Sequence, residues 1–149
     1  MNPLLLSRFT ATSCIGRGLG ETAASLHAQR SGLAPCTFET VRLDTYVGEV
    51  PGVDDESLPR ELRRFDCRNN RLAQLGLRQD GFMDAVRESA SRWGRRRVGL
   101  VLGTSTSGML ATEIAYRHRD PATGALPPDL DYAATHNPYS LADFARLLL

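Results

Sequence analysis

The chain has 149 residues, 42% of them hydrophobic and 23% charged, which is the composition of an ordinary globular domain. A net charge of +1 gives the whole molecule no attraction to nucleic acid or to a membrane surface. Cys14, Cys36 and Cys67 lack C-x-x-C spacing, so they predict buried free thiols, without a disulfide framework or a metal site. The N-terminal apolar run is too short for a signal peptide or a membrane span, and we expect a cytoplasmic protein that carries no cofactor.

The first third of the chain predicts a strand, a helix and a strand pair. Residues 4–14 are rich in Leu, Thr and Phe and predict a first strand that ends at Gly16. A helix is expected over 21–32, with Gly32 as its C-terminal stop. Residues 37–50 alternate β-branched or aromatic residues with charged ones, which is typical of a half-exposed strand or hairpin.

A basic helix is predicted over residues 60–75. At about 100° per residue, its arginines fall on one side and its large apolar residues on the other. The basic side holds Arg60, Arg63, Arg64, Arg68 and Arg71, and the apolar side holds Leu62, Phe65 and Leu72. Gly76 is expected to interrupt it. A second helix is expected over 77–93, with Phe82, Val86 and Trp93 packed inward.

Residues 98–103, VGLVLG, form an uninterrupted apolar run of the kind that is buried on both faces of a sheet. The run ends in the turn 103–108, GTSTSG. A phosphate loop would need a lysine after Gly108, a dinucleotide fingerprint needs a middle glycine, and a nucleophile elbow around Ser105 needs a glycine at position 107. The remaining interpretation from the residues is a tight turn in which small side chains let two backbones approach closely.

The last part of the chain predicts a helix over 108–118 with Met109, Ile114 and Ala115 inward, a Pro- and Gly-rich loop over 119–138, and a final helix over 139–149. Ser140 and Asp143 have the spacing of a capping pair for this helix. Its inward residues are expected to be Leu141, Phe144, Ala145 and Leu148. The element order is that of an α/β domain. Because the sequence ends on three leucines without a cap, we expect that the domain continues beyond it.

Two stretches resemble the N-terminal part of a β-ketoacyl-acyl-carrier-protein synthase, a condensing enzyme of the thiolase-like family. The first is 14–36, CIGRGLGETAASLHAQRSGLAPC, with its turn Gln29-Arg30-Ser31-Gly32-Leu33. The second is 96–109, RRVGLVLGTSTSGM, which is similar to the family's Arg-Val-Gly-x-x-x-Gly-Thr-x-x-Gly-Gly. The stretches DTYVGEVPGVD and DYAATHNPYSLADF look most like the sequences of synthases from aryl-polyene type pathways.

The resemblance implies the N-terminal half of a thiolase-like fold, a mixed sheet flanked by helices, incomplete in residues 1–149. It implies an acyltransferase whose full length performs decarboxylating Claisen condensation of an acyl thioester with a malonyl carrier, as in fatty acid or polyketide synthesis. The family's reactive cysteine and two histidines would follow residue 149, so no catalytic residue is expected here. None of the three cysteines lies in the family's nucleophile motif, and His136 is not one of the family's histidines.

The resemblance also implies contacts with substrate and partner. Thr106 would line the acyl pocket, although a packing turn without substrate contact is the alternative. Arg63, Arg64 and Arg68 would bind an acidic acyl carrier protein, although a solvated face paired with acids such as Glu61 and Asp66 is equally open. The family implies a dimer, either of identical chains or with a second synthase subunit. Two other functions remain: a chain-length factor, which is a homologue without the cysteine, and a free-standing small α/β binding protein.

Overall fold

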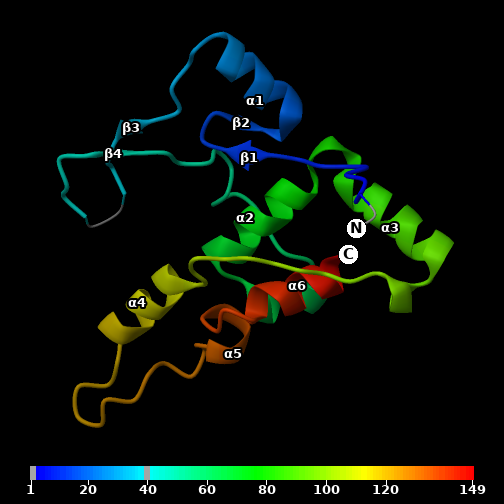
Figure 1. Ribbon diagram of the computed structural model, residues 1–149. Coiled ribbons are helices and arrows are strands. Elements are labelled where there is room, and N and C mark those ends of the chain that lie inside the picture. The colour runs from blue at the N-terminus through cyan, green and yellow to red at the C-terminus, as the bar shows by residue number, and fades with distance from the viewer. Residues whose placement is uncertain (1–2, 39–40) are drawn as a thin grey trace. The chain divides into compact units, whose positions relative to one another are not determined.

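A computed structural model describes residues 3–38 and 41–149. Helices and short strands are both present, so the mixed α/β class is confirmed (Figure 1). The chain divides into two compact units, one formed by Met1–Gly52 and Gly76–Ala85, the other by Val53–Leu75 and Val86–Leu149. The strands described form two separate antiparallel pairs, so the larger mixed sheet expected from the sequence is not formed here.

The first unit is built around a tight hairpin and helix α1. Strands β1 (Thr12–Ser13) and β2 (Gly16–Arg17) pair antiparallel, and α1 (Gly18–His27) follows directly. The expected strand over 4–14 is therefore reduced to two residues, and its leucines are exposed because nothing described pairs with them. Strands β3 (Ala34–Pro35) and β4 (Tyr46–Val47) form a second antiparallel pair. Only β4 lies within the predicted range 37–50, because β3 precedes it, and residues 39–40 of that range lie outside the described residues.

Helix α1 ends at His27, five residues before the end of the predicted range. The left-handed conformation that was expected of Gly32 at the end of the helix is taken by Gln29. Gly32 serves a different purpose. A Cβ at position 32 would overlap the carbonyl oxygen of Cys14, and a Cβ at Gly48 would come 2.6 Å from the Cys14 Sγ. Both glycines therefore let the chain pass close to the β1–β2 turn.

The core of the second unit joins the basic segment to the C-terminal helices. Its buried side chains are Leu58, Leu62, Phe65, Ala134, Leu141 and Phe144. The rings of Phe65 and Phe144 lie 6.0 Å apart and tilted, and Phe144 is fully buried. Helix α6 (Ser140–Leu148) supplies the inward face predicted for it, with Leu148 packed at the edge of the core. The predicted Ser140–Asp143 cap is wrong, since no side chain caps this helix and the Ser140 hydroxyl is buried without a partner.

The single helix expected over 60–75 is two helices. Arg60–Phe65 is a 3₁₀ helix, and α2 (Arg68–Leu77) begins after a break at Asp66. The Phe65 carbonyl accepts a hydrogen bond from the Asn70 side chain at 2.8 Å, which takes the place of a helical backbone donor. Gly76 does not interrupt α2. Leu72, expected inward, is exposed.

Helix α3 (Phe82–Trp93) and helix α4 (Met109–Arg117) occur where helices were predicted, with two errors in their faces. Phe82 and Val86 are half-buried, but Trp93 is exposed. In α4 only Ala115 is buried, whereas Met109 and Ile114 are exposed. A short helix, α5 (Tyr132–Thr135), lies within the expected loop, with Asp131 as its N-cap.

The predicted buried strand at 98–103 is wrong for this structure. The segment is extended at Val98 but forms no strand, and all six residues are exposed. Figure 1 shows it as the long connection between α3 and α4. A strand exists only when a neighbour accepts and donates its backbone hydrogen bonds, and no described segment does so for these residues.

Candidate functional site

The arginine cluster of the second unit, defined as Arg60, Arg63, Arg64, Arg68 and Arg71, is largely engaged by carboxylates. Arg64 pairs with Asp131 at 3.1 Å and also lies over the Phe65 ring. Arg64 therefore connects the 3₁₀ helix to the N-terminus of α5. Because both partners are well exposed to solvent, the pair contributes little to stability.

The two α2 arginines of the cluster bind acids in a two-pronged geometry. Arg68 donates to both carboxylate oxygens of Asp54 at 3.0 and 3.1 Å. Arg71 donates to both oxygens of Asp66 at 2.5 and 2.9 Å. The hydrogen bond to Asp66 raises the pKa of Arg71 above its ordinary value. Nearby carboxylates therefore compensate the charges of Arg68 and Arg71. For Asp66 this agrees with the alternative interpretation of the basic face, in which local acids pair with the arginines.

Arg60 and Arg63 differ from the rest of the cluster. Both are exposed on the 3₁₀ helix, and neither forms an ion pair with any residue that the structure describes. Of the three predicted carrier-binding residues, Arg63 alone therefore presents an uncompensated charge. Arg64 and Arg68 would have to exchange a local carboxylate for one on a partner.

The turn 103–108 packs against the loop that follows α5. The Ser107 hydroxyl donates to the His136 carbonyl oxygen, and the Gly108 N–H donates to the Thr135 carbonyl oxygen at 2.8 Å. A Cβ at Gly108 would come 2.6 Å from the Thr135 oxygen, so this position requires glycine. The close backbone approach expected from small residues is present at Ser107 and Gly108.

Thr106 lies just before this contact, and its side chain is exposed. Its carbonyl oxygen accepts a hydrogen bond from the Thr104 hydroxyl, which closes a small bend. The hollow in the first unit, described below, does not include Thr106. Its assignment to an acyl pocket stays a prediction.

A contact that sequence reasoning missed joins α4 to the same loop. The Thr112 Oγ1 and the His136 Nδ1 lie 2.7 Å apart, and the Tyr132 ring lies 5.0 Å from the imidazole. A hydroxyl within reach of an imidazole is the geometry of an activated nucleophile. Here Thr112 also lies 3.3 Å from the Gly108 carbonyl oxygen, as a helical threonine commonly does, and the pair is accounted for as packing. No spacing in the sequence signalled this pair.

All three cysteines are free. Cys67 is buried as predicted, whereas Cys14 and Cys36 are partly exposed. Burial raises the pKa of the Cys67 thiol, which keeps it neutral and unreactive. Its Sγ lies 3.9 Å from the Thr135 carbonyl oxygen, next to the contact of the turn with Thr135.

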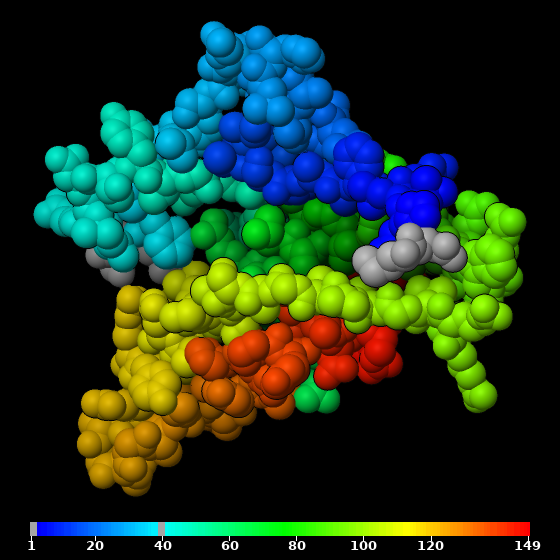
Figure 2. Space-filling model, viewed as in Figure 1, coloured from blue at the N-terminus to red at the C-terminus, as the bar shows by residue number. Residues whose placement is uncertain are grey.

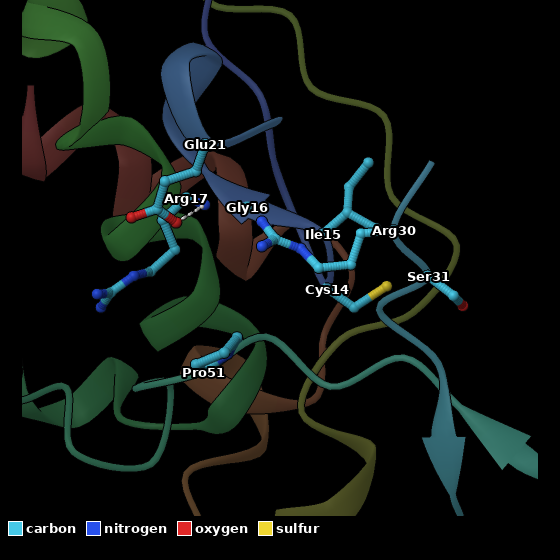
Figure 3. A pocket seen from close by; sticks show the side chains of 8 residues that line it. All are labelled: Cys14, Ile15, Gly16, Arg17, Glu21, Arg30, Ser31 and Pro51. Atoms are coloured by element: carbon cyan, nitrogen blue, oxygen red, sulfur yellow. Dashed lines mark hydrogen bonds between the residues drawn. The ribbon is translucent and has the colours of Figure 1, made fainter. Parts of the chain in front are cut away.

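A hollow of about 200 Å³ opens in the first unit beside the β1–β2 turn (Figure 3). The residues that line it are Cys14, Ile15, Gly16, Arg17, Glu21, Arg30, Ser31 and Pro51. Arg30 extends into this group and donates to the fully buried Ser25 hydroxyl at 2.6 Å, which itself donates to the Ile15 carbonyl at 2.5 Å. The guanidinium thus braces the turn, and Glu21 accepts from the Arg17 N–H at 2.8 Å. Cys14 contributes a partly exposed thiol to the lining, and the Glu21 carboxylate that shares the lining is engaged by the Arg17 N–H.

Comparisons with known proteins add no relative. No protein-family model, no curated protein and no solved structure matches the chain. Within the described part of the chain, no group of three or more His, Cys, Asp or Glu side chains is placed to hold a metal ion. Nor does any helix among the residues described have the length and apolar character needed to cross a bilayer.

Proposed function

We propose that this chain is the N-terminal part of a β-ketoacyl-acyl-carrier-protein synthase with a thiolase-like fold. The complete enzyme would accept an acyl group on a cysteine thiolate and condense it with a malonyl carrier as carbon dioxide leaves. The proposal rests on the residue motifs at 14–36 and 96–109. It is supported by the contact of Gly108 with Thr135, because that contact joins the glycine-rich turn to DYAATHNPYSLADF, the stretch that looks like synthases of aryl-polyene type pathways.

In this proposal residues 1–149 supply binding and no catalytic group. Thr106 would border the acyl chain, since the turn that carries it is held in place by Ser107 and Gly108 while its own side chain stays free. Cys67 is buried, with a raised pKa, and is accounted for by packing. The cysteine and histidines of the reaction would be encoded after residue 149.

The acidic carrier protein would dock on the arginine cluster of the second unit. Electrostatic complementarity of this kind accelerates association and sets orientation more than it adds affinity. Arg63 carries the clearest support because its charge is uncompensated among the described residues. Arg64 and Arg68 would contribute after releasing Asp131 and Asp54.

Binding of an acyl carrier protein to the 149-residue chain tests the docking. Reversing Arg63 to Glu should weaken binding by roughly tenfold and flatten its salt dependence, because it removes an attraction and adds a repulsion. Arg64→Glu/Arg68→Glu should weaken it as well. Arg117→Glu, on α4, is the matched control and should leave affinity unchanged. Equal affinity for wild type and the Arg63 variant would show that the cluster is only surface.

The codons after residue 149 test the enzyme itself. An open frame that encodes a small-residue stretch around Ala-Cys-Ser or Ala-Cys-Ala supports a synthase. Gln or Glu in place of that cysteine indicates a chain-length factor. A natural stop directly after Leu149 would exclude both and favour a small binding protein.

A further inference from the structure

Residues 92–103 combine a basic cluster with an extended segment whose backbone is unpaired. From position 89 to position 112 there is no acidic residue, while Arg92, Arg95, Arg96 and Arg97 all fall within this stretch. Arg95–Arg97 forms one exposed 3₁₀ turn, and Arg92 lies over the exposed Trp93 ring at 4.9 Å. None of these four arginines forms an ion pair with a described residue.

The segment 98–103 that follows is open to a partner. Val101 is 96% exposed, and a Cβ at Gly99 or Gly103 would meet nothing within 4 Å. No N–H or C=O group from residue 99 to residue 103 bonds to another described residue. Figure 2 shows the segment in yellow-green as an uncovered ridge.

An extended backbone with free donors and acceptors pairs readily with another strand, and natural proteins usually protect such an edge. Here the protection is missing within the segment itself, which has no charge, no proline and no bulge. The charges stand to one side, on the turn that precedes it. This arrangement supplies backbone hydrogen bonds along the segment and positive charge at one of its ends.

We propose that residues 95–103 form a strand-addition site for an extended acidic peptide. The peptide pairs antiparallel with residues 98–103, so its C-terminal end reaches Arg95–Arg97, where its carboxylates are bound. The exposed fraction of the side chains alternates along the segment, since Leu100 is 42% exposed while its neighbour Val101 is almost fully exposed. The face that carries Val101 is therefore the one open to side chains of the peptide. The site shares residues 96–103 with the motif on which the proposed function rests, and it exists only while no neighbouring strand covers residues 98–103.

Charge distinguishes this occupant from a second copy of the chain. Two copies of 98–103 could pair, but each would bring only the polar turn 103–108 to the other's arginines, which leaves those charges uncompensated. An acidic strand satisfies both the backbone and the arginines. We therefore assign the site to an acidic partner and treat self-pairing as an outcome of the test.

Fluorescence anisotropy of the 149-residue chain with a labelled synthetic peptide tests the site. The probe alternates valine and threonine and ends in glutamates at its C-terminus. We expect saturable binding. Successive N–H groups of an extended segment point to opposite edges, so one of the two variants Leu100→Pro and Val101→Pro removes an N–H from the edge that pairs with the peptide. That variant should weaken binding at least tenfold. Arg95→Gln/Arg96→Gln/Arg97→Gln should weaken it about threefold to tenfold and flatten its salt dependence. Circular dichroism verifies that each variant stays folded, and Arg117→Gln/Arg119→Gln is the control.

Three comparisons decide the result. The same peptide with alternate backbone amides N-methylated, or with its glutamates moved to the N-terminus, should bind more weakly. Equal binding of polyglutamate would overturn strand addition and leave only a charge effect. Sedimentation showing concentration-dependent dimers that Val101→Pro abolishes would assign the segment to a second copy. Absence of peptide binding at any salt concentration would overturn the proposal outright.

Discussion

The Asp80 carboxylate caps helix α1 at the backbone N–H of Leu19, 61 residues earlier in the sequence, with oxygen–nitrogen distances of 3.0 and 3.2 Å. The same carboxylate accepts from the Thr10 hydroxyl at 2.7 Å. The residue at the N-cap position, Arg17, has no side chain able to do this. Asp80 therefore joins the 76–85 segment to the N-terminal hairpin within the first unit.

Removing this cap should destabilise the first unit. Replacing Asp80 with Ala leaves the Leu19 N–H without its acceptor and places an alanine at φ 55°, where asparagine and aspartate are tolerated better. We expect a loss of about 1–2 kcal/mol in the free energy of unfolding. Asp80→Asn keeps an oxygen acceptor and the backbone preference, so urea denaturation should show a smaller loss. If both variants unfold at the wild-type midpoint, the cap contributes nothing.

The close approach of Gly48 to Cys14 gives a rescue experiment. Gly48→Ala should destabilise the chain, because the new Cβ would meet the Cys14 Sγ at 2.6 Å. Cys14→Ala removes that sulfur and should restore most of the loss. At Gly32 the obstacle is the Cys14 carbonyl oxygen, so Cys14→Ala should not rescue Gly32→Ala. Thermal unfolding of the three single and two double variants measures the difference, and rescue at both glycines would contradict the geometry.

The reactivity of the three thiols should separate by burial. Cys67 is buried and its pKa is raised by desolvation, so Cys14 and Cys36 should react with a disulfide reagent faster than Cys67 at neutral pH. A raised thiol pKa favours the neutral form in the folded state. The contribution of the neutral Cys67 thiol to the free energy of unfolding is therefore complete at pH values below the thiol pKa of the unfolded chain. It is lost as the pH rises through the thiol pKa of the folded chain.

Reaction of the native chain with the reagent should then show two fast phases and one slow phase, and the slow phase should speed up on unfolding. Cys67→Ala should remove only the slow phase. Three equal rates in the native protein would mean that Cys67 is accessible.

Helix positions were predictable where local signals agreed. The apolar spacing of Leu141, Phe144 and Ala145 gave the inward face of α6 correctly, because a period near 3.6 depends only on neighbours in the sequence. Strand pairing was not predictable in the same way. The run 98–103 has the composition of a buried strand, but burial requires partners, and no residue described here supplies them.

The candidate site shows the same limit. The spacing placed five arginines on one side of a single expected helix, but the break at Asp66 divides that helix in two. The five are Arg60, Arg63, Arg64, Arg68 and Arg71. Their carboxylate partners could be foreseen only in part. Asp66 is near in sequence and was expected, whereas Asp131 reaches Arg64 through the packing of α5 on the 3₁₀ helix. A long-range ion pair of this kind leaves no local sequence signal.

Thr106 separates a substrate role from a structural one. Its side chain is exposed in the bend before Ser107, so Thr106→Phe should leave the stability of the 149-residue chain within about 0.5 kcal/mol of wild type. In the longer enzyme that we propose, the same substitution should shorten or abolish the acyl chains accepted, because the added ring would fill space that the chain needs. Thr106→Ser keeps a small hydroxyl side chain and should preserve the chain-length preference. Product analysis by mass spectrometry distinguishes the variants. An unaltered chain-length distribution for Thr106→Phe would leave the turn with a packing role alone.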